Sequence, residues 1–507
     1  MTPNIVIVMC DQFRADLRKS RGYALDTMPF LDEWSRRGVD FLGGYTPNPV
    51  CLPARVSMFT GRYPSAHRVH TNHNKDDVLY TEDILDVLKK QGYVTAACGK
   101  NHSHRNPGDF DYHALNDHMA KYYDGMTKEG YEEFSDFLND TKHMEAHSPA
   151  PGGIEAQHPY RNVTSAFDFI DNHAGDKPFF LWLSFAEPHS PYHVPEPYFD
   201  MFPPESLPAI TTSADDLPAK GDRFVWLRKQ WEEVMGEDID RRIVRTRSNY
   251  HGMLRLIDDQ FKRFIEGLER RGISDNTLVM FVADHGDFVG EYGLIRKGAD
   301  LAELLVNIPF ICAGAGVTAP RADDTSMINL IDILPTLCEL TGADTPFGCQ
   351  GRSLVPLLQG NPISDEEFST AYSESGFSGL YWDDNDTLDT ETEGAKNPYV
   401  TFDCLNSWTQ SGQVRMARRG EYKVQIDMME RGYLYNLKED PLEINNLWNH
   451  PAHTHIKAEM LAALAGCVLR ASDPLPPPHW RYRVKTHPHG YWFDGSYTSG
   501  DTGIRPK

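Results

Sequence analysis

Short runs that are apolar at nearly every position recur along the first 365 residues of the chain. The longest are Asn4 to Cys10, Pro178 to Phe185 and Thr277 to Ala283, and shorter ones are Val94 to Cys98 and Asn307 to Ala313. Continuous apolar runs of this length, rich in β-branched and aromatic residues, are typical of strands buried on both faces. We therefore predict that these five segments are strands of one buried sheet.

Helical patterns lie between these runs, at Thr81 to Gln91, Arg247 to Arg271 and Asn329 to Thr341. Strands that alternate with helices indicate a parallel sheet with helices on both faces. The sequence therefore predicts an α/β fold with a large mixed, mostly parallel sheet sandwiched by helices.

The pattern changes near residue 365. Val414 to Trp448 alternates short strand-like stretches with turns, and His455 to Cys467 reads as a helix. This predicts a small antiparallel sheet followed by a helix. We assign residues 1–365 to a catalytic domain, 366–470 to a smaller antiparallel-sheet subdomain, and 471–507 to a tail rich in proline and aromatic residues.

Polar side chains follow four of the predicted strands. In chain order they are Asp11, Lys100 with His102, His189, and Asp284 with His285. Open α/β sheets bind ligands at the carboxyl ends of their strands. We therefore expect these residues to meet at one edge of the sheet and to form a site there.

A second candidate for chemistry is the segment CLPARVSMFTGR, residues 51–62. Pro53 suits the first turn of a helix, where its missing N–H costs nothing. Cys51 would then lie at the helix N-terminus, where free N–H groups favour anions. Arg55 shares a helix face with Cys51 and has a fork of donors for an oxyanion. A buried cysteine before an ordinary helix also fits the short motif.

This segment resembles the C-x-P-x-R signature of type I sulfatases, members of the alkaline phosphatase superfamily. A second run resembles a motif that is common in the C-terminal subdomain of sulfatases. The residues that match this motif are Tyr435, Leu437, Asp440, Pro441, Glu443, Asn446 and Leu447. The resemblance implies an alkaline phosphatase-like fold. It also implies that a formylglycine-generating enzyme oxidises Cys51 to formylglycine, whose hydrated aldehyde is the nucleophile.

The resemblance implies one divalent metal ion. Its implied ligands are Asp11, Gln12, residue 51 (Cys51 or its formylglycine), Asp284 and His285. Gln12 replaces a second aspartate of many members, and His285 replaces an asparagine. Both variants occur in the branch of choline sulfatases and phosphonate monoester hydrolases. Carboxylate ligands suit a hard cation, so we expect Ca²⁺, with Mg²⁺ or Mn²⁺ as alternatives.

Lys100 and His102 match the family's G-K-x-H motif. The resemblance implies that the lysine binds the sulfate oxygens and that the histidine removes a proton to release sulfate. An imidazole titrates near neutral pH and suits that work. Phosphonate monoester hydrolases typically carry Tyr and Thr at these positions, which favours a sulfate substrate.

Three further residues match family positions on the substrate side. The resemblance places His189 and Lys297 at the oxygen of the leaving group, where they would neutralise or protonate it. It places Asn72 in contact with the substrate, although an ordinary turn residue explains Asn72 nearly as well.

Composition narrows the partners. The formal net charge of −23 disfavours nucleic acid and anionic membranes. An anionic substrate therefore needs local positive charge, which Arg55, Lys100, Lys297 and a metal would supply. No apolar run approaches the length of a membrane span. Eight scattered cysteines and no recognisable secretion signal predict a cytoplasmic protein.

The predicted substrate is a small-molecule or saccharide sulfate ester, and the sequence does not choose its alcohol half. Three alternatives stay open: a phosphonate monoester or phosphodiester hydrolase of the same superfamily, an inactive anion-binding scaffold, and an enzyme that uses Cys51 as a thiolate. The tail also carries much apolar surface, which predicts a homo-oligomer whose tail crosses between subunits. Its aromatic residues are Trp480, Tyr482, Tyr491, Trp492 and Phe493.

Overall fold

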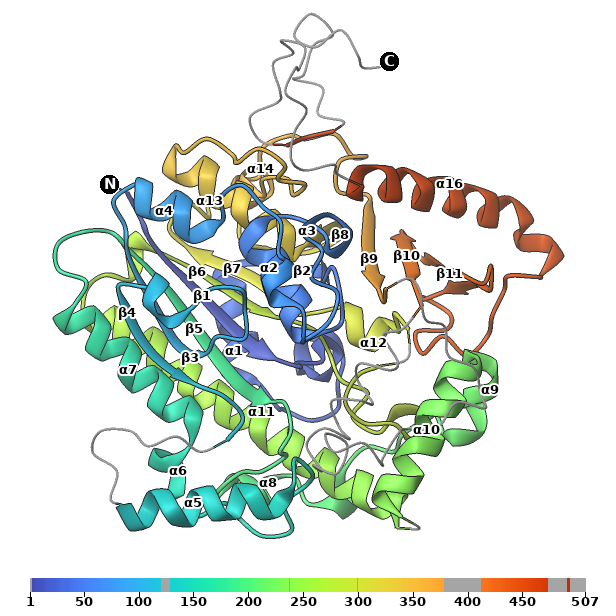
Figure 1. Cartoon of the computed structure of the whole chain (residues 1–507), viewed down its shortest axis with the longest axis horizontal. Helices are drawn as coiled ribbons and strands as arrows, with labels where there is room; N and C mark the ends of the chain where they lie inside the picture. Colours follow the sequence, from blue (N-terminus) through green and yellow to red (C-terminus); the bar gives the residue numbers. More distant parts are fainter. Residues whose placement is uncertain are drawn as a thin grey trace, which may run out of the picture.

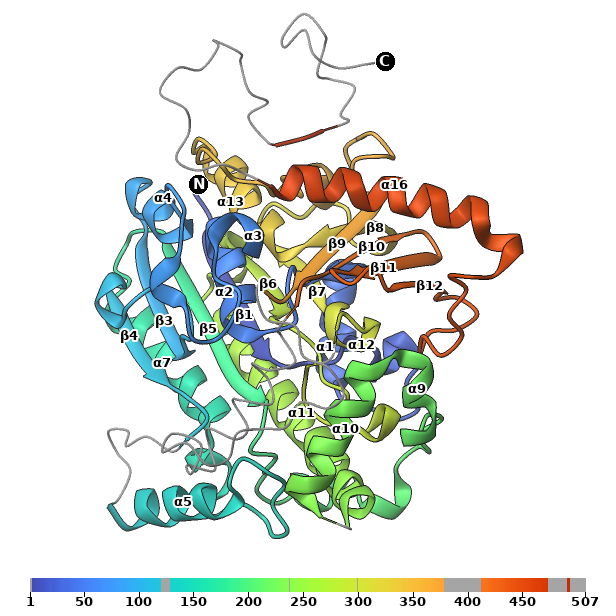
Figure 2. The ribbon, with the colours of Figure 1, turned by 45° about the vertical axis from the view of Figure 1, so that its right-hand side comes forward.

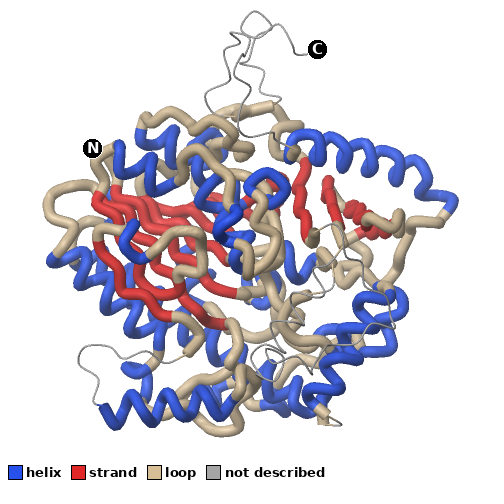
Figure 3. Tube along the Cα trace, viewed as in Figure 1, coloured by secondary structure: helices blue, strands red, loops and turns tan. Residues whose placement is uncertain are grey.

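The computed structural model describes residues 2–119, 128–236, 238–298, 300–377, 412–472 and 490–492. An eight-stranded sheet lies at its centre (Figures 1 and 3). In spatial order its strands are β4 (Tyr112–Asn116), β3 (Val94–Lys100), β5 (Phe179–Pro188), β1 (Asn4–Asp11), β6 (Thr277–Ala283), β7 (Phe310–Gly314), β2 (Gly38–Tyr45) and β8 (Arg321–Asn329). Neighbouring strands are parallel except at β7, which runs antiparallel to β6 and to β2. The predicted mixed, mostly parallel sheet is confirmed.

All five apolar runs became strands of this sheet. Every residue of β1, β5 and β6 is buried, as the continuous apolar pattern predicted. Strands β4 and β8 lie at the two edges, and their burial is interrupted, so neither has a fully apolar run. Strand β2 was missed because it contains Gly43 and Gly44. A Cβ at Gly43 would lie 2.4 Å from the carbonyl oxygen of Ser326, so only glycine allows β2 and β8 to approach.

Helices cover both faces of the sheet (Figure 1). On one face lie α1 (Pro29–Trp34), α7 (His158–Asn172) and α11 (Ile239–Arg270), and on the other lie α2 (Cys51–Thr60), α4 (Ile84–Lys90), α13 (Ile333–Thr341) and α14 (Val355–Gln359). The three predicted helices correspond to α4, α11 and α13, although α11 begins earlier than its pattern indicated. Among the described residues, no helix is both long and apolar enough to span a membrane.

The remaining helices are short or peripheral. They are α3 (Pro64–His67), α5 (Lys128–Thr141), α6 (Gly153–Ala156), α8 (Tyr198–Met201), α9 (Leu217–Lys220), α10 (Asp222–Met235) and α12 (Glu303–Val306). Helices α9 and α10 lie near the second sheet (Figure 2).

A separate antiparallel sheet forms the C-terminal part. Its strands, in order, are β12 (Gly432–Asn436), β11 (Tyr422–Asp427), β10 (Val414–Arg419) and β9 (Thr370–Ser375). Helix α16 (Thr454–Ala471) packs across this sheet (Figure 2). The predicted small antiparallel sheet and helix are confirmed, while the exact domain boundaries stay a prediction.

Buried and half-buried charges join the second sheet to the rest of the molecule. We call Lys220, Glu303, Arg418, Lys423 and Glu443 the inter-sheet charge cluster. The Glu443 carboxylate lies 2.7 Å from Lys423 Nζ and 3.1 Å from Lys220 Nζ, and it accepts the Glu303 N–H at 3.0 Å. The Glu303 carboxylate accepts in turn from Arg418 at 2.7 Å and from Lys423 at 3.2 Å.

The described part of the tail packs on its own chain. Tyr491 is buried, and its hydroxyl donates to the carbonyl of Ser353 at 3.0 Å. The Trp492 N–H donates to Glu367 at 2.7 Å. The predicted exchange of tails between subunits stays a prediction, and the other tail aromatics lie outside the described residues.

Candidate active site

Helix α2 presents Cys51 at its first turn. Cys51 is the first helical residue, all ten residues of α2 are buried, and the cap residue Val50 supplies no side-chain hydrogen bond. The Leu52 N–H donates instead to Asn72 Oδ1 at 3.1 Å. Gly61 ends the helix in the left-handed conformation. The predicted place of Cys51 at a helix N-terminus is confirmed, and Asn72 caps that terminus.

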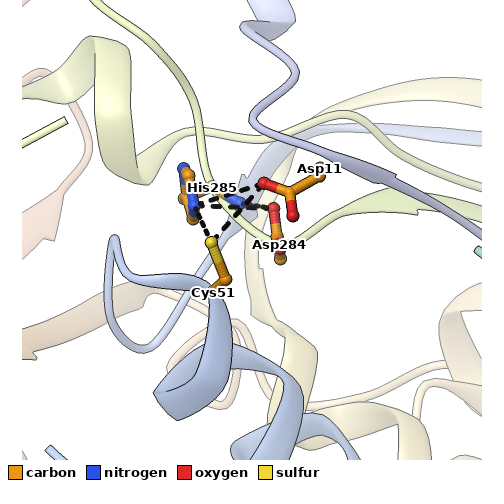
Figure 4. Close-up of side chains that lie close together, drawn as sticks. All are labelled: Asp11, Cys51, Asp284 and His285. Carbon is orange, nitrogen blue, oxygen red and sulfur yellow. Dashed lines mark hydrogen bonds and ion pairs between the residues drawn. The ribbon is translucent and has the colours of Figure 1, made fainter. Parts of the chain in front are cut away.

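Three residues from the sheet surround Cys51 (Figure 4). Asp11 ends β1, and Asp284 and His285 follow β6. Strands β1 and β6 are parallel, with Cys10 opposite Ala283, so their next residues emerge side by side. The candidate ligand atoms of these four residues lie within 4.8 Å of one another. Asp11 Oδ1 and His285 Nε2 lie 3.5 and 3.2 Å from Cys51 Sγ.

This donor set fits a divalent cation. His285 Nδ1 lies 2.8 Å from the carbonyl of Gly286 and must donate to it, because a carbonyl oxygen only accepts. The ligand-competent nitrogen is therefore Nε2, which lies 3.7 Å from Asp11 Oδ1 and 3.8 Å from Asp284 Oδ1. A backbone carbonyl that fixes the ring in this way is typical of a metal-binding histidine. Two fully buried carboxylates complete a set rich in negative charge.

Arg55 holds the two carboxylates in place. Its Nε donates to Asp284 at 2.9 Å and its Nη2 to Asp11 at 3.3 Å. Its Nη1 donates to Ser184 Oγ at 2.9 Å and to the carbonyl of Lys100 at 3.0 Å. The guanidinium is fully buried, so these contacts fix the positions of the acidic residues as well as the charge of the site.

Two lysines add positive charge beside Cys51. Lys297 Nζ lies 3.1 Å from Cys51 Sγ, and Lys100 forms a short ion pair with Asp11. Burial and Asp11 act to raise the pKa of the Cys51 thiol. The two ammonium groups and His285 outweigh them, so the pKa of Cys51 is well below its usual value. We call the whole group the nucleophile cluster, which comprises Asp11, Cys51, Arg55, Lys100, Asp284, His285 and Lys297.

Gln12 connects Lys297 to a buried acid. Lys297 donates to Gln12 Oε1 at 3.3 Å, and Gln12 Nε2 donates to the Asp287 carboxylate. Asp287 also accepts the N–H groups of Val289 at 2.7 Å and of Arg296 at 2.8 Å, which closes the loop before Lys297. The Gln12 side chain is therefore engaged beside the predicted metal site, and its role as a ligand stays a prediction.

His102 lies on a tightly held loop. Its φ of 37° is in the left-handed region, which is uncommon for a residue with a side chain. The loop is anchored because His104 and Arg105 both bond the carboxylate of Asp83, at 2.9 and 2.7 Å. Burial and the charge of Lys100 lower the pKa of His102, although a hydrogen bond with Cys51 acts to raise it. Its Nδ1 is buried without a hydrogen-bond partner among the described residues.

His189 lies beyond β5 at the same edge of the sheet. Its Nδ1 donates to the carbonyl of Ser190 at 2.6 Å, which leaves Nε2 for other partners. Burial and the positive charge of Lys297 hold the pKa of His189 well below its usual value. The predicted meeting of polar residues at the carboxyl ends of β1, β3, β5 and β6 is confirmed.

Sequence reasoning missed three residues of the site. Ser184 binds Arg55 and is the one polar residue within the apolar run from Phe179 to Phe185, a signal that was available. Asp287 lies two residues past His285 in the sequence. His118 follows edge strand β4, which has no apolar run, so no pattern pointed to it.

Comparisons with known proteins give one family. The family model described as Sulfatase matches residues 3–343. An arylsulfatase of Clostridium perfringens is 31% identical over 391 residues, which cover 71% of this chain and 79% of that protein. A choline-sulfatase of Rhizobium meliloti is 25% identical over 89% of this chain and 83% of its own. The solved phosphonate monoester hydrolase of Agrobacterium radiobacter superimposes with a TM-score of 0.71 at 20% identity, covering 92% of this chain and 96% of that one.

Proposed function

We propose that this chain acts through a formylglycine at position 51 and one bound divalent cation. The premise is that the chain belongs to the sulfatase family and is a sulfuric ester hydrolase. The observation that carries the proposal is the nucleophile cluster. A cysteine at a helix N-terminus lies between an acidic and imidazole ligand set on one side and two lysines on the other.

Asp11, Asp284, His285 and residue 51 would hold the cation. When bound, it supplies positive charge that polarises a sulfate oxygen and the nucleophile. Imidazole nitrogen is a poorer ligand for Ca²⁺ than for transition metals. Ca²⁺ nevertheless stays the expected ion, with Mg²⁺ and Mn²⁺ as alternatives, because the two carboxylates suit a hard cation. Metal analysis of the purified protein tests this choice.

The chain's own residues divide the remaining work. When Cys51 is converted to formylglycine, the hydrated aldehyde supplies the nucleophilic oxygen at the place of Sγ. Asp11 Oδ1 lies 3.5 Å from that place, in reach of the proton that the nucleophile loses. Lys100, which bonds Asp11, has further N–H groups for the sulfate oxygens.

Departure of the alcohol and release of sulfate fall to other residues. In the unmodified protein burial acts to lower the pKa of Lys297, but Cys51 and Asp11 outweigh it and raise that pKa; Asp11 remains nearby after Cys51 is converted. Lys297 therefore neutralises the leaving oxygen, together with His189. His102, whose pKa is lowered, is neutral near neutral pH and takes the proton whose loss releases sulfate.

Sulfate esters are favoured over phosphonate monoesters because Lys100 and His102 occupy the G-K-x-H positions. Gln12 and His285 favour the second candidate, a phosphonate monoester or phosphodiester hydrolase, since they reduce the negative charge near the anion. An inactive scaffold would not need the complete nucleophile cluster that the structure contains.

The names of the relatives suggest the first substrates to try, an aryl sulfate and choline sulfate. The decisive assay compares kcat/KM for an aryl sulfate and the matching aryl phosphonate monoester, on protein matured by a formylglycine-generating enzyme. A sulfate preference that Cys51→Ala abolishes supports the proposal, and a phosphonate preference overturns it. The cytoplasm stays the proposed compartment, which cell fractionation tests.

A further inference from the structure

His118 lies against the site, outside the residues that the proposed reaction uses. It occupies a bend just after β4, the edge strand next to β3. In the parallel register of these strands Lys100 is opposite Asn116, so His118 is two residues beyond the end of the ladder. That position brings its half-buried imidazole to the same edge of the sheet as Lys100 and His189.

The first contact of His118 is with Lys100. His118 Nε2 lies 2.7 Å from Lys100 Nζ. An ammonium group has no lone pair to accept with, so Lys100 donates and Nε2 accepts. The hydrogen of the neutral ring is therefore on Nδ1. Burial, followed by the nearby His189 and Lys100, holds the pKa of His118 well below its usual value, which agrees with a neutral acceptor.

The second contact is with His189. The two imidazole rings are stacked, with centroids 3.9 Å apart and planes 20° from parallel. Because Nδ1 of His189 is already fixed by the Ser190 carbonyl, a ring packed on its face restricts the remaining rotation about the side chain. One side chain thus contacts both the lysine proposed for the sulfate oxygens and the histidine proposed for the leaving group.

We propose that His118 is a positioning residue that aims Lys100 at the sulfate group and holds the ring plane of His189 at the leaving oxygen. The inference rests on the proposed sulfatase reaction. Lys100 has three N–H groups, of which Asp11 takes one and His118 another, so a single direction is left for the substrate. Such preorganisation strengthens binding of the anion in a site that excludes water.

Two substitutions separate the two contacts. His118→Phe keeps an aromatic ring on His189 and removes the acceptor for Lys100. His118→Gln keeps an acceptor for Lys100 and removes the stacked ring. His113→Gln is the matched control, because His113 is exposed and lies on β4, the strand that precedes His118.

The experiment measures kcat/KM for a series of aryl and alkyl sulfates with increasingly poor leaving groups. Values are normalised to the formylglycine content of each preparation. We expect His118→Phe to lose on the order of tenfold to a hundredfold for every substrate, because Lys100 is misplaced equally for all of them. We expect His118→Gln to lose little with the best leaving groups and on the order of tenfold with the poorest, which makes the leaving-group dependence steeper.

Binding of inorganic sulfate, measured by calorimetry, is a second readout that requires no turnover. We expect His118→Phe to weaken sulfate binding about tenfold, while His118→Gln and His113→Gln bind as the parent protein does. Equal sulfate affinity in all four proteins, or an unchanged leaving-group dependence in His118→Gln, overturns the inference. A parent protein without sulfatase activity overturns the proposed function instead, and the binding measurement still decides the role of His118.

Discussion

The inter-sheet charge cluster and the nucleophile cluster both bury charged side chains, and they are built differently. In the inter-sheet charge cluster, Glu443 is paired with two lysines and a backbone N–H, and Glu303 with a lysine and an arginine. Each charged group of this cluster therefore has a partner of opposite charge within the cluster. In the nucleophile cluster, three cationic side chains and two carboxylates converge on a cysteine, and His102 Nδ1 beside them has no partner among the described residues.

The difference shows what burial of charge accomplishes in each place. A closed set of pairs fixes how two parts of the fold meet, and breaking one pair leaves an uncompensated buried charge. An open set keeps its excess positive charge for a ligand, which agrees with an anionic substrate in a chain of formal charge −23. Substitutions in the first cluster should therefore change stability, and substitutions in the second should change turnover.

The largest expected effect is that of Cys51→Ala. Loss of a nucleophile removes the covalent route, so we expect kcat/KM for an aryl sulfate to fall by about 10³-fold or more. The melting temperature should change little, because the side chain becomes smaller but no buried charge loses its only partner. Retention of more than a tenth of the activity would contradict the assignment.

His102→Ala should have the next largest effect. Removal of a general base costs about 10²- to 10⁴-fold, and here the loss should fall on sulfate release. Rapid-mixing experiments should show a burst of alcohol equal to the active sites, followed by slow turnover. His104→Gln is the comparison variant because it lies two residues away and bonds Asp83. Slow turnover without a burst would show that His102 acts in or before cleavage of the sulfate ester bond, and not in the release of sulfate.

Glu443→Gln should act on stability alone. Breaking a buried charge pair costs about 3–5 kcal/mol in the free energy of unfolding, measured by urea titration. Activity per folded molecule should be unchanged. Glu421→Gln, which breaks the exposed pair with Lys438, is the control and should leave the urea midpoint almost in place. A loss of kcat/KM in the folded Glu443→Gln variant would contradict the claim that the inter-sheet charge cluster acts on stability alone.

The same cluster predicts a dependence on pH. Burial acts to raise the pKa of Glu443, but Lys220 and Lys423 outweigh it and lower the pKa from 4.5 to about 2. Because the folded pKa is depressed, its stabilisation is present above pH 4.5 and is lost as pH falls toward 2. The stability difference between parent and Glu443→Gln should shrink by about 3 kcal/mol over that range. A constant difference would contradict the pairing.

Asn72→Ala should have the smallest effect. Asn72 caps the N-terminus of α2, and loss of such a cap costs about 1 kcal/mol. Asn72→Asp keeps the acceptor and should keep the stability. If Asn72 also contacts the substrate, kcat/KM should fall in both variants, because the new carboxylate repels sulfate. Unchanged kcat/KM in both would leave Asn72 a capping residue only.

The sequence predicted those parts of the fold that carry a strong local pattern. Strands β1, β5 and β6 are apolar throughout because both of their faces are covered. The antiparallel direction of β7 has no local signature, since strand direction depends on partners far along the chain. The edge strand β4 has too few apolar positions to be recognised.

The same limit applies to the site. Cys51, Asp11 and Asp284 were predictable because each lies in a motif or directly follows a strand. The hydrogen bonds of Gln12 to Lys297 and Asp287 depend on a loop that returns to the sheet edge, which no spacing reveals. His118 lies at the site because β4 pairs with β3, and this pairing could not be read from the sequence.

The most direct test of the central claim relates activity to the chemistry of residue 51. Preparations that differ in their degree of maturation are assayed with an aryl sulfate, and peptide mass gives the fraction of Cys51 converted to formylglycine. We expect kcat, per mole of protein, to rise in proportion to that fraction and to extrapolate to zero for the unmodified cysteine. Activity that is independent of the converted fraction would show that the thiolate, and not formylglycine, is the nucleophile.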